Sequence, residues 1–278
     1  MTAKLHLPPL VIKREGSYGM FPSIQRLGIV ILLASSLDLA LSFCNPLPLM
    51  AASITLRDGT RCEGQFQGLN GRGLCVYSQG EFGSQGESGS PYDYYKGEIR
   101  NGVPNGTGIF VYQNDDRYEG QVSNGVPNGR GMFLFSNNDR YEGAIRNGVP
   151  NGTGTFTFTT GDRYVGSVRN GQPHGLGTFI FSKGQRYTGE FYLGQVNGNG
   201  VLIHPNGIRC EGTFYNSLLT GKGTCTYPAG SSYRSYTGEL RKGLPEGRGI
   251  LTYANGQRYS GEFRNGKPGR SQSQDSGQ

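Results

Sequence analysis

The stretch YEGQVSNGVPNGRGMFLFSNNDR occupies residues 118–140, and YEGAIRNGVPNGTGTFTFTTGDR follows it directly at residues 141–163. Units of the same kind recur every 23 residues over most of the chain, with longer steps only before Tyr95 and Tyr236. They begin at Cys62, Tyr95, Tyr118, Tyr141, Tyr164, Tyr187, Cys210, Tyr236 and Tyr259. Self-similarity at a fixed period indicates a repeat protein, which buries its core between neighbouring units rather than around one centre.

Each unit contains two runs of alternating polar and apolar residues, separated by two turn signals. The first signal is Asn-Gly-x-Pro-Asn-Gly, and the second is rich in Asn, Asp and Gly. Asn-Gly supplies the positive φ angles that tight hairpin turns require. The chain has 48 glycines, yet its 17 tyrosines and 14 phenylalanines are too many for a disordered chain. The sequence therefore predicts an all-β antiparallel meander of tandem hairpins without helices.

Alternation along a strand assigns the side chains to two faces. One face receives the aromatic rings and most of the glycines. In the two quoted units its invariant positions are Tyr118, Gly120, Gly129, Gly131, Tyr141, Gly143, Gly152 and Gly154. If Asn124 to Gly129 form the turn, Ser123 faces Arg130 and Gly120 lies opposite Phe133. Each ring would then cover a glycine across the strand pair.

The opposite face carries an arginine directly before the first residue of most units. The candidate contacts for an anionic surface are Arg117, Arg140, Arg163, Arg186 and Arg209. One interpretation is a basic ladder for phosphates or acidic lipid headgroups. The interpretation that we favour is a solvated face with local Arg–Glu pairs, because Glu63, Glu119, Glu142 and Glu211 follow four of the arginines after two residues.

The unit YEGxxxNGxPNGxGxFxF resembles the MORN repeat, the membrane occupation and recognition nexus motif. The resemblance covers residues 54–268 in about nine units, of which the first and last are degenerate or partial. The chain departs from the family at the fifth position, where the family often has Trp and this chain has residues such as Ile99 or Val122. The resemblance implies an elongated, twisted single sheet that serves in scaffolding, protein binding or association with a membrane surface.

Four cysteines interrupt the repeat in a correlated way. Cys62 and Cys210 stand at the Tyr position, and Cys75 and Cys225 stand at the first aromatic position of the same two units. This coincidence predicts the disulfides Cys62–Cys75 and Cys210–Cys225, although the turn assumed above places each pair diagonally, at about 7–8 Å between Cα atoms. The alternative is four buried thiols at aromatic sites. Disulfides would favour an exported protein over a cytoplasmic one.

Residues 1–52 are predicted to be a signal peptide or a membrane anchor. Leu27 to Phe43 form an apolar stretch preceded by Arg26, and Leu49-Met50-Ala51-Ala52 offers a cleavage site. Met20 precedes this pattern and is a second candidate start. The alternatives are an uncleaved anchor and a buried helix, although 17 residues that include Asp38 are short for a membrane span. At the other end, residues 269–278 are polar and predicted to be disordered.

No motif points to catalysis, a cofactor or a metal. The histidines His6, His174 and His204 lack a second ligand at metal spacing, and the many Gly-x-Gly pairs lack the strand-to-helix transition of nucleotide-binding loops. The net charge is +7 without a run of adjacent basic residues, so a nucleic acid is not an expected partner.

These observations lead to a functional prediction with two alternatives. The sequence predicts a non-catalytic scaffold for an unidentified protein partner, either exported to a periplasmic or extracellular space or anchored in a membrane. The first alternative is a module that binds anionic phospholipid through the arginines. The second is an enzyme acting on surface glycans, for which Asp93 and Glu246 are the carboxylates outside the repeat pattern. The oligomeric state is open.

Overall fold

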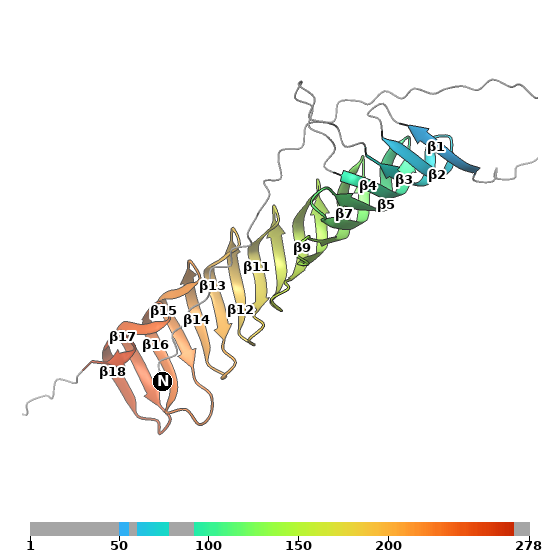
Figure 1. Cartoon of the computed structure of the whole chain (residues 1–278). Helices are drawn as coiled ribbons and strands as arrows, with labels where there is room; N and C mark the ends of the chain where they lie inside the picture. The colour runs from blue at the N-terminus through green and yellow to red at the C-terminus, as the bar shows by residue number, and fades with distance from the viewer. Residues whose placement is uncertain (1–49, 56–59, 78–91, 270–278) are drawn as a thin grey trace, which may run out of the picture. The chain divides into compact units, whose positions relative to one another are not determined.

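The computed structural model describes residues 50–55, 60–77 and 92–269. In these residues the chain forms nineteen strands and no helix, as the sequence predicts. The strands belong to two compact units, which divide the chain between Pro150 and Asn151. We call residues 50–150 the N-terminal unit and residues 151–269 the C-terminal unit. Within each unit the hairpins follow one another side by side (Figure 1).

The N-terminal unit holds the first eight strands and the first two residues of the ninth. Its strands are β1 (Met50–Thr55), β2 (Arg61–Gln67), β3 (Asn70–Val76), β4 (Tyr92–Arg100), β5 (Val103–Tyr112), β6 (Arg117–Ser123), β7 (Val126–Leu134) and β8 (Arg140–Arg146). From β1 to β8, each strand pairs antiparallel with its neighbour in sequence. This order is the meander that the repeat predicts.

The C-terminal unit holds the remaining strands in the same arrangement. Its strands are β9 (Val149–Thr157), β10 (Arg163–Arg169), β11 (Gln172–Ile180), β12 (Arg186–Tyr192), β13 (Gln195–Ile203), β14 (Arg209–Tyr215), β15 (Leu218–Thr226), β16 (Tyr233–Arg241), β17 (Leu244–Tyr253), β18 (Arg258–Arg264) and β19 (Lys267–Pro268). Every strand again pairs antiparallel with its sequence neighbour.

The first turn of each repeat is shorter than the sequence suggested. In the β6–β7 hairpin only Asn124 and Gly125 form the turn, with φ angles of 50° and 79°. Ser123 consequently pairs with Val126 rather than with Arg130. Two residues with positive φ make a hairpin turn whose twist matches that of the strands, which is why the chain closes at the first Asn-Gly and not over the whole six-residue motif.

A β-bulge between Gly120 and Val122 then sets the register of the rest of the hairpin. Gly120 pairs with Gly131, and Tyr118 pairs with Phe133, so the predicted pairing of Gly120 with Phe133 is wrong. The predicted faces are nevertheless confirmed, because Tyr118 and Phe133 are both buried on the aromatic face. Three residues of β7, Asn128 to Arg130, lie opposite the single residue Gln121 of β6. This two-residue offset shifts the pairing without changing which side chains point inward.

The tyrosine that begins each unit fills the space over the paired glycines. Tyr118 is fully buried, and its hydroxyl donates a hydrogen bond of 2.6 Å to the carbonyl of Gln121 in the bulge. A Cβ atom added at Gly131 would overlap the ring of Tyr118. The same hydroxyl bond recurs at Tyr95, Tyr141, Tyr164, Tyr187, Tyr236 and Tyr259. Tyrosine and glycine are therefore complementary parts of one packing unit.

Hydrogen bonds at both ends of the strands join neighbouring repeats. At the first turn, the amide of Gly125 donates to the carbonyl of Pro104 at 2.9 Å. At the second turn, the amide of Ser182 donates to a carboxylate oxygen of Asp162 at 2.8 Å. Because proline lacks an N–H group and still offers a carbonyl, it suits a position where only an acceptor is used. These bonds add to the strand pairing that fixes the distance between repeats.

Candidate binding surface

The two faces of the sheet differ in what they leave accessible. The aromatic face is filled by its own side chains: Tyr95, Tyr118, Tyr141, Tyr164, Tyr187 and Tyr236 all have relative exposures of 0%. Further rings pack against them, as where the centroids of Tyr118 and Phe133 lie 4.9 Å apart. The opposite face, which we call the outward face, bears the arginines and a set of exposed aliphatic and aromatic residues.

The arginines before the tyrosine positions fall into two groups. Four of them form ion pairs with the glutamate two residues further along the same strand. These pairs are Arg61–Glu63 at 2.7 Å, Arg117–Glu119 at 2.9 Å, Arg140–Glu142 at 2.9 Å and Arg209–Glu211 at 2.8 Å. The local pairing predicted from the sequence is thus present. All eight side chains are at least two-fifths exposed, so each pair stabilises the fold only slightly.

The second group consists of Arg163, Arg186 and Arg258, because Val165, Thr188 and Ser260 replace the glutamate after them. Arg163 and Arg186 belong to adjacent repeats. Neither arginine has an ion-pair partner among the residues that the structure describes. Both pair across the strands with the same residue, Ile180 on β11. This segment of the outward face therefore presents two uncompensated positive charges on either side of an exposed aliphatic side chain.

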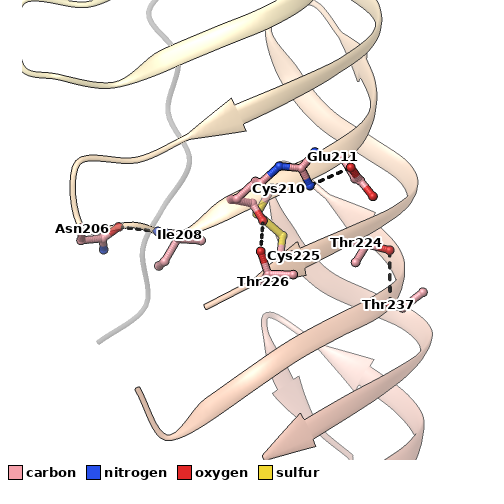
Figure 2. Close-up of a disulfide and its surroundings, with 9 residues drawn as sticks. Asn206, Ile208, Cys210, Glu211, Thr224, Cys225, Thr226 and Thr237 are labelled. Atoms are coloured by element: carbon pink, nitrogen blue, oxygen red, sulfur yellow. Dashed lines mark hydrogen bonds and ion pairs between the residues drawn. A yellow bond between two sulfur atoms is a disulfide. The ribbon is translucent and has the colours of Figure 1, made fainter. Parts of the chain in front are cut away.

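The cysteines are bonded as Cys62–Cys75 and Cys210–Cys225. Each pair lies directly opposite on adjacent strands, with Cα atoms 3.9 Å and 4.0 Å apart. Figure 2 shows Cys210–Cys225. The diagonal placement expected from the sequence is wrong. In the C-terminal unit, the two-residue turn and the bulge together shift the pairing, which brings Cys210 opposite Cys225. Both bonds lie on the aromatic face at buried positions that other repeats give to Tyr and Phe.

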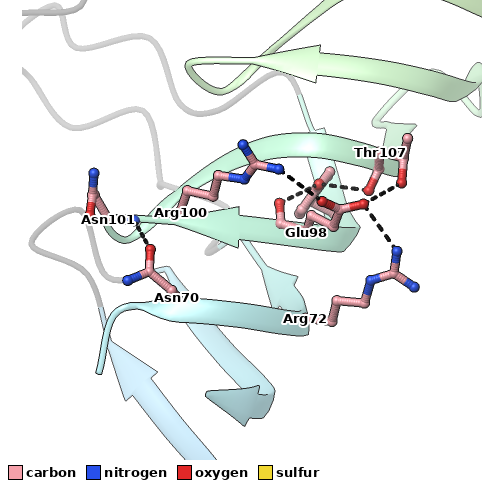
Figure 3. A network of polar contacts seen from close by, with 7 residues as sticks. Asn70, Arg72, Glu98, Arg100, Asn101 and Thr107 are labelled. Atoms are coloured by element: carbon pink, nitrogen blue, oxygen red, sulfur yellow. Dashed lines mark hydrogen bonds and ion pairs between the residues drawn. The ribbon is translucent and has the colours of Figure 1, made fainter. Parts of the chain in front are cut away.

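A polar cluster on β3–β5 was not predicted from the sequence (Figure 3). The carboxylate of Glu98 accepts hydrogen bonds from the Thr107 hydroxyl at 2.7 Å and from Arg72 at 3.0 Å, and Arg100 lies at 3.5 Å. The hydrogen bond from Thr107, followed by that from Arg72, lowers the pKa of Glu98. Neighbouring strands supply these groups, and only the correct register reveals that they meet.

Two of the three histidines, His174 and His204, lie in the described part of the chain. His204 is half-buried at an aromatic position, and desolvation lowers its pKa. The His174 ring lies 5.4 Å from that of Tyr192 on the next strand. His6 lies outside the described residues. Within those residues no three His, Cys, Asp or Glu side chains come together as a set that could hold a metal ion. Asp93 on β4 and Glu246 on β17 lie in different units.

The predicted signal or anchor segment lies almost entirely outside the described residues, as does the tail at 270–278. Residues 50–52, at its end, are part of β1 and pair with β2, so the folded part of the chain begins before the predicted array. No helix in the described ranges is long and apolar enough to cross a membrane.

The fold and the outward face together define a repeat protein built of β-hairpins, in which each unit has one accessible face. The MORN repeat pattern matches residues 95–117, 118–140, 141–163, 164–186, 187–209, 210–232, 236–258 and 259–269. These eight consecutive matches cover more than half of the chain, which therefore belongs to the MORN repeat family. The hairpin β2–β3, with Cys62, precedes the first match.

Other comparisons add little to this assignment. No curated protein matches the sequence significantly. The TCP domain of SAS-4 from Drosophila melanogaster, solved with a proline-rich motif of Ana2, is 21% identical over 57% of this chain and 85% of that chain, with a TM-score of 0.37. The G-box domain of the microcephaly protein CPAP is 12% identical over 77% and 100%, with a TM-score of 0.31. These scores are too low to indicate a shared fold.

Proposed function

We propose that this protein is a non-catalytic scaffold, exported or held at a membrane, which binds protein partners on its outward face. The family is one of repeat scaffolds and binding proteins, and the aromatic face is closed by its own rings. The observation that carries the proposal is that exposed aliphatic residues recur at one position of the repeat on the outward face of each unit. Val76, Leu134 and Ile180 have relative exposures of 53%, 36% and 36% at equivalent positions in three repeats.

These aliphatic residues stand between arginines on the neighbouring strands. Leu134 pairs with Arg117 on one side and Arg140 on the other, and Ile180 is placed in the same way. Apolar side chains within a polar frame are typical of protein interfaces, whose buried centre is apolar and whose rim is charged. Seven glutamates of the described residues form ion pairs with nearby arginines, which suits a binding surface better than acid–base chemistry.

Export is supported by the two disulfides, because bonds of this kind persist in oxidising compartments and not in the cytoplasm. Alkylation of the unreduced protein, recovered from its own cell fraction, followed by mass analysis tests this part. Bonded Cys62–Cys75 and Cys210–Cys225 are the expected result. Four alkylated thiols would argue against an oxidising compartment.

Crosslinking and affinity capture after cell fractionation test the scaffold proposal. We expect one or a few proteins to be recovered with the wild-type chain and to be lost when Leu134 and Ile180 are both replaced by Glu. Replacement of the exposed residues Gln113 and Lys183 by Glu serves as the control for added negative charge. A chain that recovers no specific protein from any fraction would contradict the proposal.

An anionic lipid surface is the second candidate, and Arg163 and Arg186 favour it because neither is neutralised by a glutamate. Cosedimentation with vesicles of phosphatidylserine and phosphatidylcholine tests it. Binding that weakens with salt and falls when both arginines are changed to Gln would support the lipid function. The matched control changes Arg117 and Arg140, whose charges are already paired. Binding that is absent or independent of salt would exclude it.

A further inference from the structure

The outward face of the C-terminal unit bears an apolar patch on β11–β14. The patch lies near the ends of these strands that meet at the first turn of each repeat. The four most exposed large apolar side chains of the described residues gather there. They are Leu176, Tyr215, Leu193 and Tyr192, with relative exposures of 69%, 64%, 58% and 56%. Contiguous exposed apolar groups of this size mark an interaction site more often than isolated ones do.

The patch arises where two adjacent repeats depart from the repeat pattern. Tyr192 and Tyr215 occupy the position that is Arg169 in the preceding repeat and Arg241 in the following one. Both follow a buried phenylalanine on the aromatic face, so their own rings point outward. The repeat thus loses a charge at two successive places and gains an accessible ring at each.

The register fixes how far apart these two rings stand. Tyr187 and Cys210 both pair with Leu202, so β12 and β14 lie at the same level on either side of β13. Tyr192 and Tyr215 each come five residues later, and two strand spacings therefore separate them, roughly 9.6 Å. On β11, the strand that precedes β12, the ring of His174 lies 5.4 Å from that of Tyr192 and supports its orientation.

Hydrogen-bond donors lie between the two rings. Gln195 on β13 pairs with Tyr192, and Asn197 precedes Gly198, which pairs with Phe214. Both amide side chains are half-buried, and neither forms a hydrogen bond within the part of the chain that the structure describes. Each offers two N–H groups toward a ligand on the outward face.

Glu190 adds to the same surface a carboxylate that forms no ion pair with a described residue. Glu190 pairs across the strands with Leu176, whereas the equivalent Glu98 has Arg72 on the neighbouring strand and forms an ion pair with it. Within the described ranges Glu190 has no ion-pair partner. Its charge is therefore available to a basic group of a partner.

From this arrangement we propose that Tyr192 and Tyr215, with Gln195, Asn197 and Glu190, bind a proline-rich segment of a partner protein that carries a basic residue at one end. The segment would run across the strands in the polyproline II conformation. This inference rests on the proposed scaffold function and names one partner class and its site.

The spacing decides between the possible extended ligands. A polyproline II helix repeats every three residues at about 3.1 Å each, or about 9.3 Å, which matches the two rings. A β-strand presents the same face every two residues, roughly 6.6 Å, and would bring only one side chain into register. Polyproline II has no internal hydrogen bonds, so its carbonyls are free to accept from Gln195 and Asn197. Aromatic rings and free donors are the features by which proteins recognise such segments.

Calorimetric titration of the full chain tests the site. The probe is a synthetic peptide of one arginine followed by ten prolines, and the comparison peptide has glutamate in place of arginine. We expect the arginine peptide to bind more tightly, and Glu190→Gln to remove most of that difference. Replacement of Tyr192 and Tyr215 together by Ser should weaken binding by about tenfold or more. The matched control is Tyr94→Ser, an exposed tyrosine in the N-terminal unit.

Circular dichroism of each variant shows whether the sheet is intact, so a loss of binding in a folded variant counts for the proposal. No binding of either peptide to the wild-type chain, or equal binding by the Tyr192 and Tyr215 variant, would overturn it. Stronger binding of a chitin or cellulose oligosaccharide than of the arginine peptide would also do so. If captured partners persist in the double variant, the scaffold function stands and only this site falls.

Discussion

A single pair of residues, the tyrosine and the glycine it covers, explains much of the composition of this chain. At Gly131 an added Cβ atom would meet three atoms of the Tyr118 side chain inside contact distance. The tyrosine cannot retreat, because its hydroxyl is held by the bulge carbonyl of Gln121. Glycine is needed here for space, whereas at Gly125 it is needed for a φ angle of 79°.

Replacement of Gly131 by Ala should therefore destabilise the fold. Forcing a methyl group into a filled site costs about 1–3 kcal/mol. Thermal unfolding followed by circular dichroism should show a lower melting temperature than in Arg130→Ala, which removes an exposed side chain from the adjacent position. Equal melting temperatures in the two variants would mean that the ring does not press on the glycine.

The buried tyrosines predict sensitivity to alkali. Burial raises the pKa of Tyr141 and of Tyr236 from 10.0 to about 12. Both pKa values are higher in the folded protein than in the unfolded chain. The stabilisation that the neutral, buried hydroxyl groups provide is therefore fully present below the tyrosine pKa of the unfolded chain. It is lost as the pH rises from about 10 to about 12.

Denaturant titrations at a series of alkaline pH values measure this loss. The free energy of unfolding should fall steadily across that interval. Tyr141→Phe should reduce the slope. An unchanged slope in the Tyr141→Phe variant would contradict the assigned burial.

At the scale of elements, the sequence predicts which residues face inward but not which residues pair. The 23-residue period and the alternation place Tyr118 and Phe133 on the buried face, and the structure confirms this. The sequence does not define the position of the turn, because the motif contains two Asn-Gly pairs and either could close the hairpin. The second pair instead lies within β7, where Gly129 has a φ angle of 115°. Pairing errors of this kind also hide clusters, such as Glu98 with Thr107, that form only across strands.

The disulfide hairpins allow a test of how local the stability is. Cys210–Cys225 closes a loop of 15 residues, and a loop of that size is worth about 3 kcal/mol. Changing both cysteines to Ser should raise hydrogen exchange in β14 and β15 more than in β17 and β18, because repeats are stabilised mainly by their neighbours. The same change at Cys62 and Cys75, in the N-terminal unit, is the control. Uniformly faster exchange along the chain would indicate global cooperativity instead.

At the scale of the whole molecule, the residues that follow the repeat pattern predict the architecture. The residues that depart from the pattern indicate the function. The disulfides occur where Cys210 and Cys225 break the aromatic rule, and the paired replacement was visible in the sequence. The replacement of arginine by Tyr192 and Tyr215 was equally visible. It could not be interpreted without the register, which shows that both rings point outward and lie two strands apart. Isolated substitutions in a repeat gain meaning only when their neighbours across the sheet are known.

If the repeat is the true structural unit, the chain should tolerate removal of one whole repeat but not of half of one. Deleting residues 164–186 removes β10 and β11 and joins Arg163 to Tyr187, which restores the Arg-Tyr sequence and leaves β12 to pair with β9 in the antiparallel sense. Deleting residues 163–171 removes β10 alone and leaves β9 and β11, which run in the same direction, joined by a short turn. A short turn can connect antiparallel strands only. Circular dichroism and thermal unfolding should show a folded sheet for the first deletion and a disrupted one for the second. Equal behaviour of the two would mean that the 23-residue period does not define the folding unit.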